Sequence, residues 1–181
     1  GETSQEISSR VAALGWRSDG QVAVLLGIAN PSPDPDAMRK IARKAGSDLL
    51  LGIQGRRQVA VIGLMVAIDK PDHAIQQIAT QLEGFFGQGP LILGTTVATV
   101  SDAPRSAKSA LAAHSVAVSV GAVKRPLPAD ELLPERALAG DSLARQTLIE
   151  TYYLPLAKSS PELLGTLRSY LDCGRSLEQT A

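Results

Sequence analysis

The first 126 residues contain two kinds of hydrophobic pattern, which predict strands and helices in turn. Short continuous runs of Val, Ile and Leu are typical of strands that are buried on both faces. Apolar residues spaced three and four positions apart are typical of helices with one buried face. The expected strands cover residues 22–28, 48–53, 58–64 and 91–100. The expected helices cover residues 2–14, 35–45, 71–85 and 102–115, while residues 116–123 fit either a helix end or a strand.

The expected helices also carry start and stop signals. Asp34 can cap a helix whose first residue is Pro35, and Gly46 can end it. Pro71 and Pro104 mark the first turns of the next two helices. The positions expected to face inward are, helix by helix, Ile7, Val11 and Leu14; Met38, Ile41 and Ala45; Ile75, Ile78, Leu82 and Phe85; and Ala107, Ala110, Leu111 and His114.

The order of the elements predicts the fold class. After the N-terminal helix, the order is β-α-β-β-α-β followed by an extra helix, which is the ferredoxin-like split β-α-β pattern. The turn residues Gln54-Gly55-Arg56-Arg57 separate two of the strands and indicate a hairpin. We therefore expect an α+β domain with an antiparallel sheet and with helices covering one face of it.

From residue 127 the pattern becomes helical, with expected helices over residues 130–139, 142–158 and 161–172. Asp141 is a good N-cap for the second helix, and Gly174 follows the third at the usual position of a C-terminal glycine. Ser176 and Gln179 form a capping box that predicts a further helix. These helices carry more apolar side chains than they can hide alone, namely Leu143, Leu148, Tyr152, Leu163, Leu167 and Tyr170. We expect them to pack on the β-containing domain or on a second chain.

Charge and cysteine content narrow the classes of function. The chain has 18 basic and 18 acidic residues, and this balance argues against strong nucleic-acid binding by these residues. The single cysteine, Cys173, excludes an internal disulfide and fits a reducing compartment. No apolar run reaches membrane-spanning length and no signal peptide is visible, so we expect a cytoplasmic protein with no membrane partner.

Motifs that carry chemistry are missing from the sequence. His73 and His114 lie 41 residues apart, and no second Cys or nearby His gives either of them a metal-ligand spacing. The sequence has no Gly-x-Ser-x-Gly elbow, and the GFFGQGP segment lacks the Lys-Ser/Thr of a phosphate loop, which favours a simple turn. We therefore expect no catalytic residue, no metal site and no cofactor, and the sequence assigns no ligand-binding residue.

Other polar and aromatic side chains allow two interpretations each. Arg56 and Arg57 suit either an anionic ligand or, as we favour, an exposed charged hairpin. His73 is expected on the surface, and His114 in the core or at an interface. Cys173 is interpreted as a bystander. Packing rather than ligand binding is expected for Tyr152, Tyr153, Leu154 and Leu156.

The C-terminal third resembles a known family. Its segments ERALAGD (135–141), TLRSYLD (166–172) and GRSLEQTA (174–181) are similar to those of the PucR/CdaR-type bacterial transcription regulators. Residues 21–121 resemble the GGDEF-like domain that precedes these segments in that family. Active nucleotide cyclases related to this domain carry metal- and nucleotide-binding carboxylates at the tip of the central hairpin. The tip here, Gln54-Gly55-Arg56-Arg57, has none, so the resemblance implies a degenerate, non-catalytic domain.

The resemblance also implies a domain organisation. Residues 1–16 would be a linker helix from a missing N-terminal domain, and residues 17–126 a GGDEF-like sensing and dimerisation domain. Residues 127–181 would lead into a DNA-binding helix-turn-helix that begins where the chain stops. A homo-oligomer that contacts DNA through that absent module is then expected, with no DNA-binding residue in these 181.

Within the family, the wording of the C-terminal third is similar to that of actinobacterial MabR-like regulators of fatty-acid synthase genes. This likeness implies control of fatty-acid or mycolic-acid biosynthesis genes in response to long-chain acyl-CoA. The alternative from another functional class is a ferredoxin-fold enzyme such as a nucleotide cyclase relative. The missing hairpin carboxylates favour the regulator.

Overall fold

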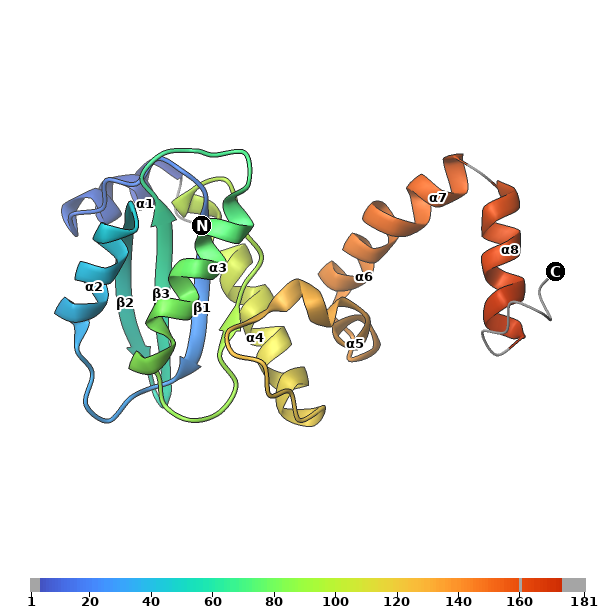
Figure 1. Cartoon of the computed structure of the whole chain (residues 1–181). Coiled ribbons are helices and arrows are strands. Elements are labelled where there is room, and N and C mark those ends of the chain that lie inside the picture. Colours follow the sequence, from blue (N-terminus) through green and yellow to red (C-terminus); the bar gives the residue numbers. More distant parts are fainter. Residues whose placement is uncertain (1–3, 160, 174–181) are drawn as a thin grey trace.

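A five-stranded sheet forms the centre of the protein, and a computed structural model describes residues 4–159 and 161–173 (Figure 1). The strand order is β2-β3-β1-β4-β5, in which the first four strands have the ferredoxin-like arrangement. The strands are β1 (Val22–Ile28), β2 (Ser47–Gln54), β3 (Arg57–Leu64), β4 (Ile92–Leu93) and β5 (Leu127–Pro128). The ferredoxin-like α+β fold is confirmed. One detail differs, because β5 lies parallel to β4 while the other neighbours are antiparallel.

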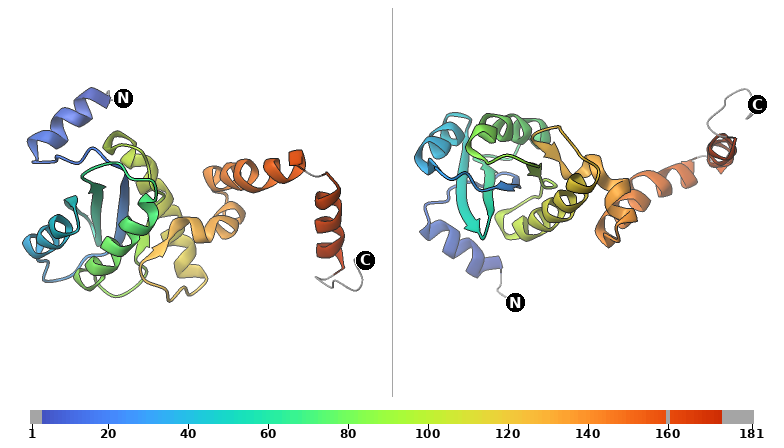
Figure 2. Two further views of the ribbon diagram at one scale, coloured as in Figure 1. Left: turned by 45° about the horizontal axis from the view of Figure 1, so that its top comes forward. Right: turned by 90° about the horizontal axis from the view of Figure 1, so that it is seen from below.

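Helices cover both faces of the sheet, so the expectation of one covered face is wrong. Seen from below, α2 (Pro35–Lys44) and α3 (Pro71–Leu82) lie on one side, and α1 (Ser4–Ala13) and α4 (Ala103–Ser119) on the other (Figure 2). Alternate side chains of β1 explain this. Ala23 and Leu25 belong to the core cluster under α2 and α3, whereas Leu26 belongs to the cluster under α4. A strand that is apolar on both faces needs cover on both sides.

The helices α2 and α3 begin and face as their sequences predict, with one exception. The Asp34 carboxylate accepts a hydrogen bond from the Ala37 N–H at 2.9 Å, which caps α2. Met38 and Ala42 are buried, but Ala45 is exposed, because the helix ends at Lys44 and Ala45 stands at its C-cap. In α3 the residues Ile75, Ile78 and Leu82 are buried, and Phe85 packs partly on the same cluster from the short helical turn η1 (Glu83–Phe85).

The face of α4 differs from the predicted one. Its buried residues are Ser106, Ser109, Ala110, Ala113, His114, Val116 and Ala117. The predicted Leu111 is exposed and Ala107 only half-buried, so that part of the prediction is wrong. Residues 116–119 continue the helix. Small residues let α4 approach the sheet so closely that a side chain on Gly94 would overlap Ser106.

The predicted strand over residues 91–100 is much shorter than expected. Only Ile92 and Leu93 pair with β1, and beyond Gly94 the chain makes one isolated bridge, between Val97 and Val22. The turn η2 (Val100–Asp102) then leads into α4. The Ser106 hydroxyl accepts a hydrogen bond from the Val24 N–H at 2.9 Å. This N–H of β1 is therefore bonded to α4 and is not free to pair with a longer β4.

A buried aromatic side chain, Trp16, anchors the N-terminal helix to the sheet domain. Trp16 packs with Val22 and Val97, and Val11 of α1 lies partly buried against the same cluster. The indole N–H donates to the Ser18 carbonyl at 3.1 Å. Leu14, expected to face inward, is 72% exposed, because the chain turns away from α1 at Gly15.

After β5 the chain forms a succession of helices that leaves the sheet. The elements are η3 (Ala129–Leu132), α5 (Leu133–Leu138), α6 (Ser142–Leu148), the π-helical turn η4 (Ile149–Tyr153), α7 (Leu154–Ser159) and α8 (Pro161–Asp172). We call residues 142–173 the helical arm; Figure 1 shows it running away from the sheet. Pro155 has no N–H for the Thr151 carbonyl, which explains the widened π-helical turn. Among the described helices, none has the length and apolar content needed to cross a bilayer.

Candidate functional site

The hairpin between β2 and β3 is an exposed, acid-free tip. A two-residue turn, Gly55 and Arg56, joins the strands, and Gly55 adopts a φ of 61° that favours glycine. Gln54 pairs with Arg57 at the last position of the ladder. All four residues are exposed. The tip is thus an exposed, charged hairpin, and its four residues offer no carboxylate to a metal or a nucleotide.

A groove of about 330 Å³ lies beside this hairpin, between β2 and the first turns of α2. We call it the α2 groove, and its lining residues are Pro33, Pro35, Met38, Arg39, Leu51, Gly52, Ile53 and Gln58. Its polar floor is satisfied: the Gln58 amide donates to the Phe85 carbonyl and accepts from the Asn30 N–H, both at 3.4 Å. Apart from Gln58, the lining residues are apolar except Arg39, which is the single cation among them.

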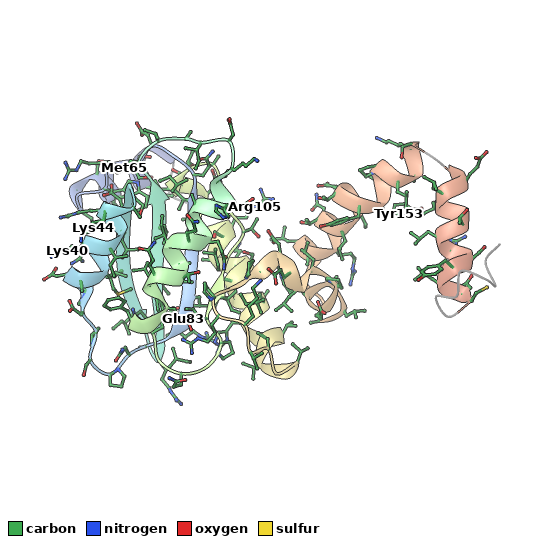
Figure 3. The ribbon with its side chains drawn as sticks, in the orientation of Figure 1. Lys40, Lys44, Met65, Glu83, Arg105 and Tyr153 are labelled. Carbon is green, nitrogen blue, oxygen red and sulfur yellow. The ribbon has the colours of Figure 1, made fainter. Side chains whose placement is uncertain are left out.

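The outer side of α2 is strongly basic. Arg39, Lys40, Arg43 and Lys44 are all exposed, and Figure 3 shows Lys40 and Lys44 pointing away from the sheet. Only Arg39 has an ion-pair partner among the described residues, Asp36 at 3.3 Å. We call these four cations the α2 basic face. This face was not predicted, although Arg39-Lys40 and Arg43-Lys44 are two basic pairs spaced four positions apart, which places them on one side of a helix.

A second cavity, of about 360 Å³, lies where the chain leaves the sheet. His73 and Gln76 of α3 line one side, and Thr95 and Asp130 line the other. His73 is exposed in the first turn of α3, as predicted. The Gln76 side-chain amide donates to the Pro126 carbonyl at 3.1 Å, which ties α3 to the segment that enters β5.

A buried arginine joins the sheet to the helical arm. Arg136 is 2% exposed, and its guanidinium lies 2.9 Å from the Asp141 carboxylate. It also donates to the Ala129 carbonyl at 3.0 Å and lies 3.6 Å from Asp130. Asp130 in turn accepts a 2.8 Å hydrogen bond from the Thr95 hydroxyl. We call this network the arm joint, because it runs from the loop after β4 to the start of α6.

Asp141 completes the joint and caps α6, as the sequence predicts. Its Oδ1 accepts from the N–H groups of Leu143, at 3.0 Å, and Ala144, at 3.2 Å. Burial alone would raise the pKa of this carboxyl. The Ala144 N–H, the hydrogen bond and charge of Arg136, and the Leu143 N–H outweigh burial and hold the pKa of Asp141 below its ordinary value. The joint is therefore an ion pair with Asp141 charged.

His114 lies in the core, one of the two placements that the sequence predicts. It is 7% exposed on the sheet-facing side of α4, and its Nε2 has no hydrogen-bond partner among the described residues. Burial lowers the pKa of His114, and the nearby charge of Arg57 lowers it further. The imidazole is therefore neutral at physiological pH.

The remaining candidates are distributed over the chain. GFFGQGP connects α3 to β4, as predicted, with the Gly87 N–H donating to the Ile28 carbonyl. Cys173 is half-buried after α8. Within residues 4–159 and 161–173, no three His, Cys, Asp or Glu side chains are grouped to hold a metal ion. Gly174 and the predicted capping box of Ser176 and Gln179 lie outside the described residues.

Residues 1–116 match the GGDEF-like domain family. The chain belongs to this family. Curated relatives include two uncharacterized proteins, Mb2266 of Mycobacterium bovis and Rv2242 of Mycobacterium tuberculosis. Each is 32% identical over 192 residues, which cover 100% of this chain and 45% of the relative. The chain thus spans about half the length of the curated relatives it matches.

A solved structure extends the likeness beyond the GGDEF-like domain. It is the crystal structure of a regulator of polyketide synthase expression from Bifidobacterium adolescentis. The two chains are 29% identical, with a TM-score of 0.72, over 96% of this chain and 69% of the other. The compared region therefore extends beyond residue 116, where the match to the GGDEF-like domain family ends, into the helices that follow.

The helical arm after the GGDEF-like domain presents its apolar side chains to solvent. Tyr152 and Tyr153 are 61% and 52% exposed, so the packing expected for them is not provided by the described part of this chain. Figure 3 shows Tyr153 on the arm, far from the labelled side chains around the sheet. The α8 residues Leu163, Leu167 and Leu171, spaced four apart, are also exposed. The sequence predicts that these residues pack either on the β-containing domain or on a second chain. In the structure they do not pack on the β-containing domain.

Proposed function

We propose that the chain is the central region of a PucR-type transcription regulator. In this proposal the GGDEF-like domain is non-catalytic and serves effector sensing and dimerisation. The helical arm leads to a DNA-binding helix-turn-helix module expected after residue 181. The regulator title of the structural neighbour and its match over 96% of the chain support the assignment. The resembling segments ERALAGD and TLRSYLD add support from the part of the chain outside the family match.

The observation that carries the non-catalytic role is the hairpin tip. Metal-bound triphosphates need oxygen ligands, and carboxylates are the usual protein source. Gln54, Gly55, Arg56 and Arg57 supply none. The alternative, a ferredoxin-fold enzyme such as a nucleotide cyclase relative, would need these groups elsewhere. Incubation of the protein with GTP and Mg²⁺ tests it, and formation of a cyclic dinucleotide would favour the enzyme.

The surface of the helical arm supports self-association. Tyr152 and Tyr153 of η4 are more than half exposed, and so are Leu163 and Leu171 of α8. Large apolar side chains that gather on one exposed surface are typical of a protein–protein contact. The arm residues 142–173 carry three basic and three acidic side chains, so no net charge opposes pairing of two copies.

Sedimentation of the chain tests this self-association. We expect a homo-oligomer, and the double variant Tyr152→Ser with Tyr153→Ser should weaken it by removing two half-exposed rings from the interface. Val123→Ser is the control, because this side chain is 92% exposed outside the arm. A wild-type chain that stays monomeric at high concentration would remove the homo-oligomer from the proposal.

The proposed effector is a long-chain acyl-CoA, and the proposed targets are fatty-acid or mycolic-acid biosynthesis genes. Both come from the resemblance to MabR-like regulators, and both imply a cytoplasmic protein. Deletion of the parent gene, followed by measurement of transcripts, tests this role. Transcripts of the target genes should change and should recover when the parent is restored. Unchanged transcripts across the genome would contradict a regulatory function.

A further inference from the structure

The α2 groove has the properties of a binding site for an aliphatic chain. Its volume of about 330 Å³ lies within the range of small-molecule sites. Met38 and Leu51 form its wall, and the flexible thioether of Met38 can adapt to different occupants. Ile53 lies on the same rim and is 60% exposed, although it is a large apolar residue at a sheet edge. The described chain leaves more than half of Ile53 uncovered, so an apolar occupant would remove an unfavourable exposure.

The α2 basic face continues directly from this groove. Arg39 belongs to both, since it lines the groove and stands next to Lys40 on the outer side of the helix. Lys40, Arg43 and Lys44 have no ion-pair partner among the described residues. Four exposed cations on two turns of one helix form the densest positive charge on a chain whose net charge is zero. Such a surface attracts phosphates.

We propose that the α2 groove and the α2 basic face together bind an anionic amphiphile. The aliphatic chain would lie in the groove against Met38 and Ile53, and a phosphate-bearing head group would lie on Lys40 and Arg43. The inference rests on the effector-sensing part of the proposed function and gives it a location. It places the ligand on the sheet domain, at the opposite end of the molecule from the helical arm (Figure 1).

The arrangement favours an amphiphile over a free nucleotide or a nucleic acid. A nucleotide would leave the apolar groove empty and would find no aromatic side chain among the groove-lining residues on which to stack its base. A nucleic acid would bring phosphates to the cations but would cover Ile53 with polar groups. Only a ligand with one apolar and one anionic end uses both surfaces at once.

Calorimetric titration of the full chain with palmitoyl-CoA, below its micelle concentration, tests the site. Free CoA should bind at least 100-fold more weakly, because it lacks the chain. Across octanoyl-, decanoyl- and dodecanoyl-CoA, affinity should rise about fourfold per added methylene. A parallel titration with palmitoyl-lysophosphatidic acid distinguishes a lipid from a thioester, since either source supplies a chain and a phosphate.

Two pairs of matched variants locate the ligand. Ile53→Glu places a charge on the groove rim and should weaken palmitoyl-CoA binding at least tenfold. Val118→Glu, at an equally exposed valine on α4, should leave binding unchanged. The double variant Lys40→Gln with Arg43→Gln should weaken binding about tenfold.

The control for the charge variant is Arg105→Gln with Lys108→Gln, which removes the same charge from α4 and should have no effect on binding. If palmitoyl-CoA binds but the groove and α2 variants match their controls, the site is wrong while effector sensing stands. If neither amphiphile binds, both the proposed site and the acyl-CoA effector are wrong. The assignment as a transcription regulator is then still tested by operator binding.

Discussion

Replacement of Arg136 by methionine should loosen the root of the helical arm. Methionine keeps the apolar stem but removes the guanidinium, so the Asp141 carboxylate, with 15% of its side chain exposed, loses its counter-charge. The Ala129 carbonyl loses its 3.0 Å donor at the same time. Breaking a buried pair from one side costs about 3–5 kcal/mol. Because Asp141 keeps two backbone N–H partners and some contact with water, we expect about 3 kcal/mol.

Amide hydrogen exchange measures this loss where it occurs. The N–H groups of Leu143 and Ala144, which Asp141 caps, should exchange about a hundredfold faster in the variant, since about 3 kcal/mol corresponds to roughly two decades. Trp16 packs with Val22 and Val97, in a cluster that contains no residue of the arm joint. Urea unfolding followed by Trp16 fluorescence should therefore show a smaller change.

The control and a second variant separate the ion pair from general damage. Arg145→Met removes an exposed arginine from the next helix and should change stability by less than about 0.5 kcal/mol. Asp141→Asn added to Arg136→Met removes the unpaired charge but keeps the cap, so it should recover part of the loss. Unchanged exchange at Leu143 and Ala144 in Arg136→Met would refute the arm joint as the element that holds the arm.

Two further predictions concern the sheet domain. Burial, and then the charge of Arg57, lower the pKa of His114 in the folded chain, so the unfolded chain binds the proton at a higher pH. The free energy of unfolding should therefore fall as pH drops from 6.5 toward the lowered folded pKa, and it should level off below that pKa. Urea midpoints between pH 5 and 8 should show this slope, and His114→Gln should flatten it. Gly63→Ala should destabilise by about 1–3 kcal/mol, because the new methyl group would overlap the Trp16 indole. Gly52→Ala, which meets open space, should stay within about 0.5 kcal/mol in the same urea series, and equal effects of the two substitutions would contradict the packing.

The sequence predicts those elements whose signals are local. The strand at residues 22–28 was predicted with its observed bounds, because Asn30 and Pro31 end a continuous apolar run. The hairpin turn at Gly55 and the cap at Asp141 were also predicted, since each depends on residues within three positions. The exposed, acid-free hairpin tip followed from the same local reading.

The elements that the sequence did not predict depend on distant partners. The strand after Leu91 stops early because Gly94 meets Ser106, on a helix that begins later in the chain. The predicted α4 face omits Ser106 and Ser109 because they are polar. Both are buried, and their hydroxyls accept hydrogen bonds from the backbone N–H groups of Val24 and Thr95. An arginine is ordinarily assigned to the surface, so the burial of Arg136 also required the folded chain.

The candidate site also has one part that the sequence could predict and one part that it could not. The α2 basic face could be predicted from helical spacing alone. The α2 groove could not, because it exists only where Met38 of α2 and Ile53 of β2 lie side by side across the sheet edge. Its apolar character depends on Gln58 having its amide satisfied by Asn30 and Phe85, and no pattern of residues along the chain indicates that.

A mobility-shift experiment tests the central claim most directly. It compares this chain with the parent protein extended past residue 181, on DNA from the parent gene's own upstream region. We expect the extended protein to shift a specific fragment. We expect no such shift from this neutral chain, because the recognition helix is proposed to lie after residue 181. Tight, sequence-specific binding by this chain alone, or no specific binding by the extended protein, would contradict the account.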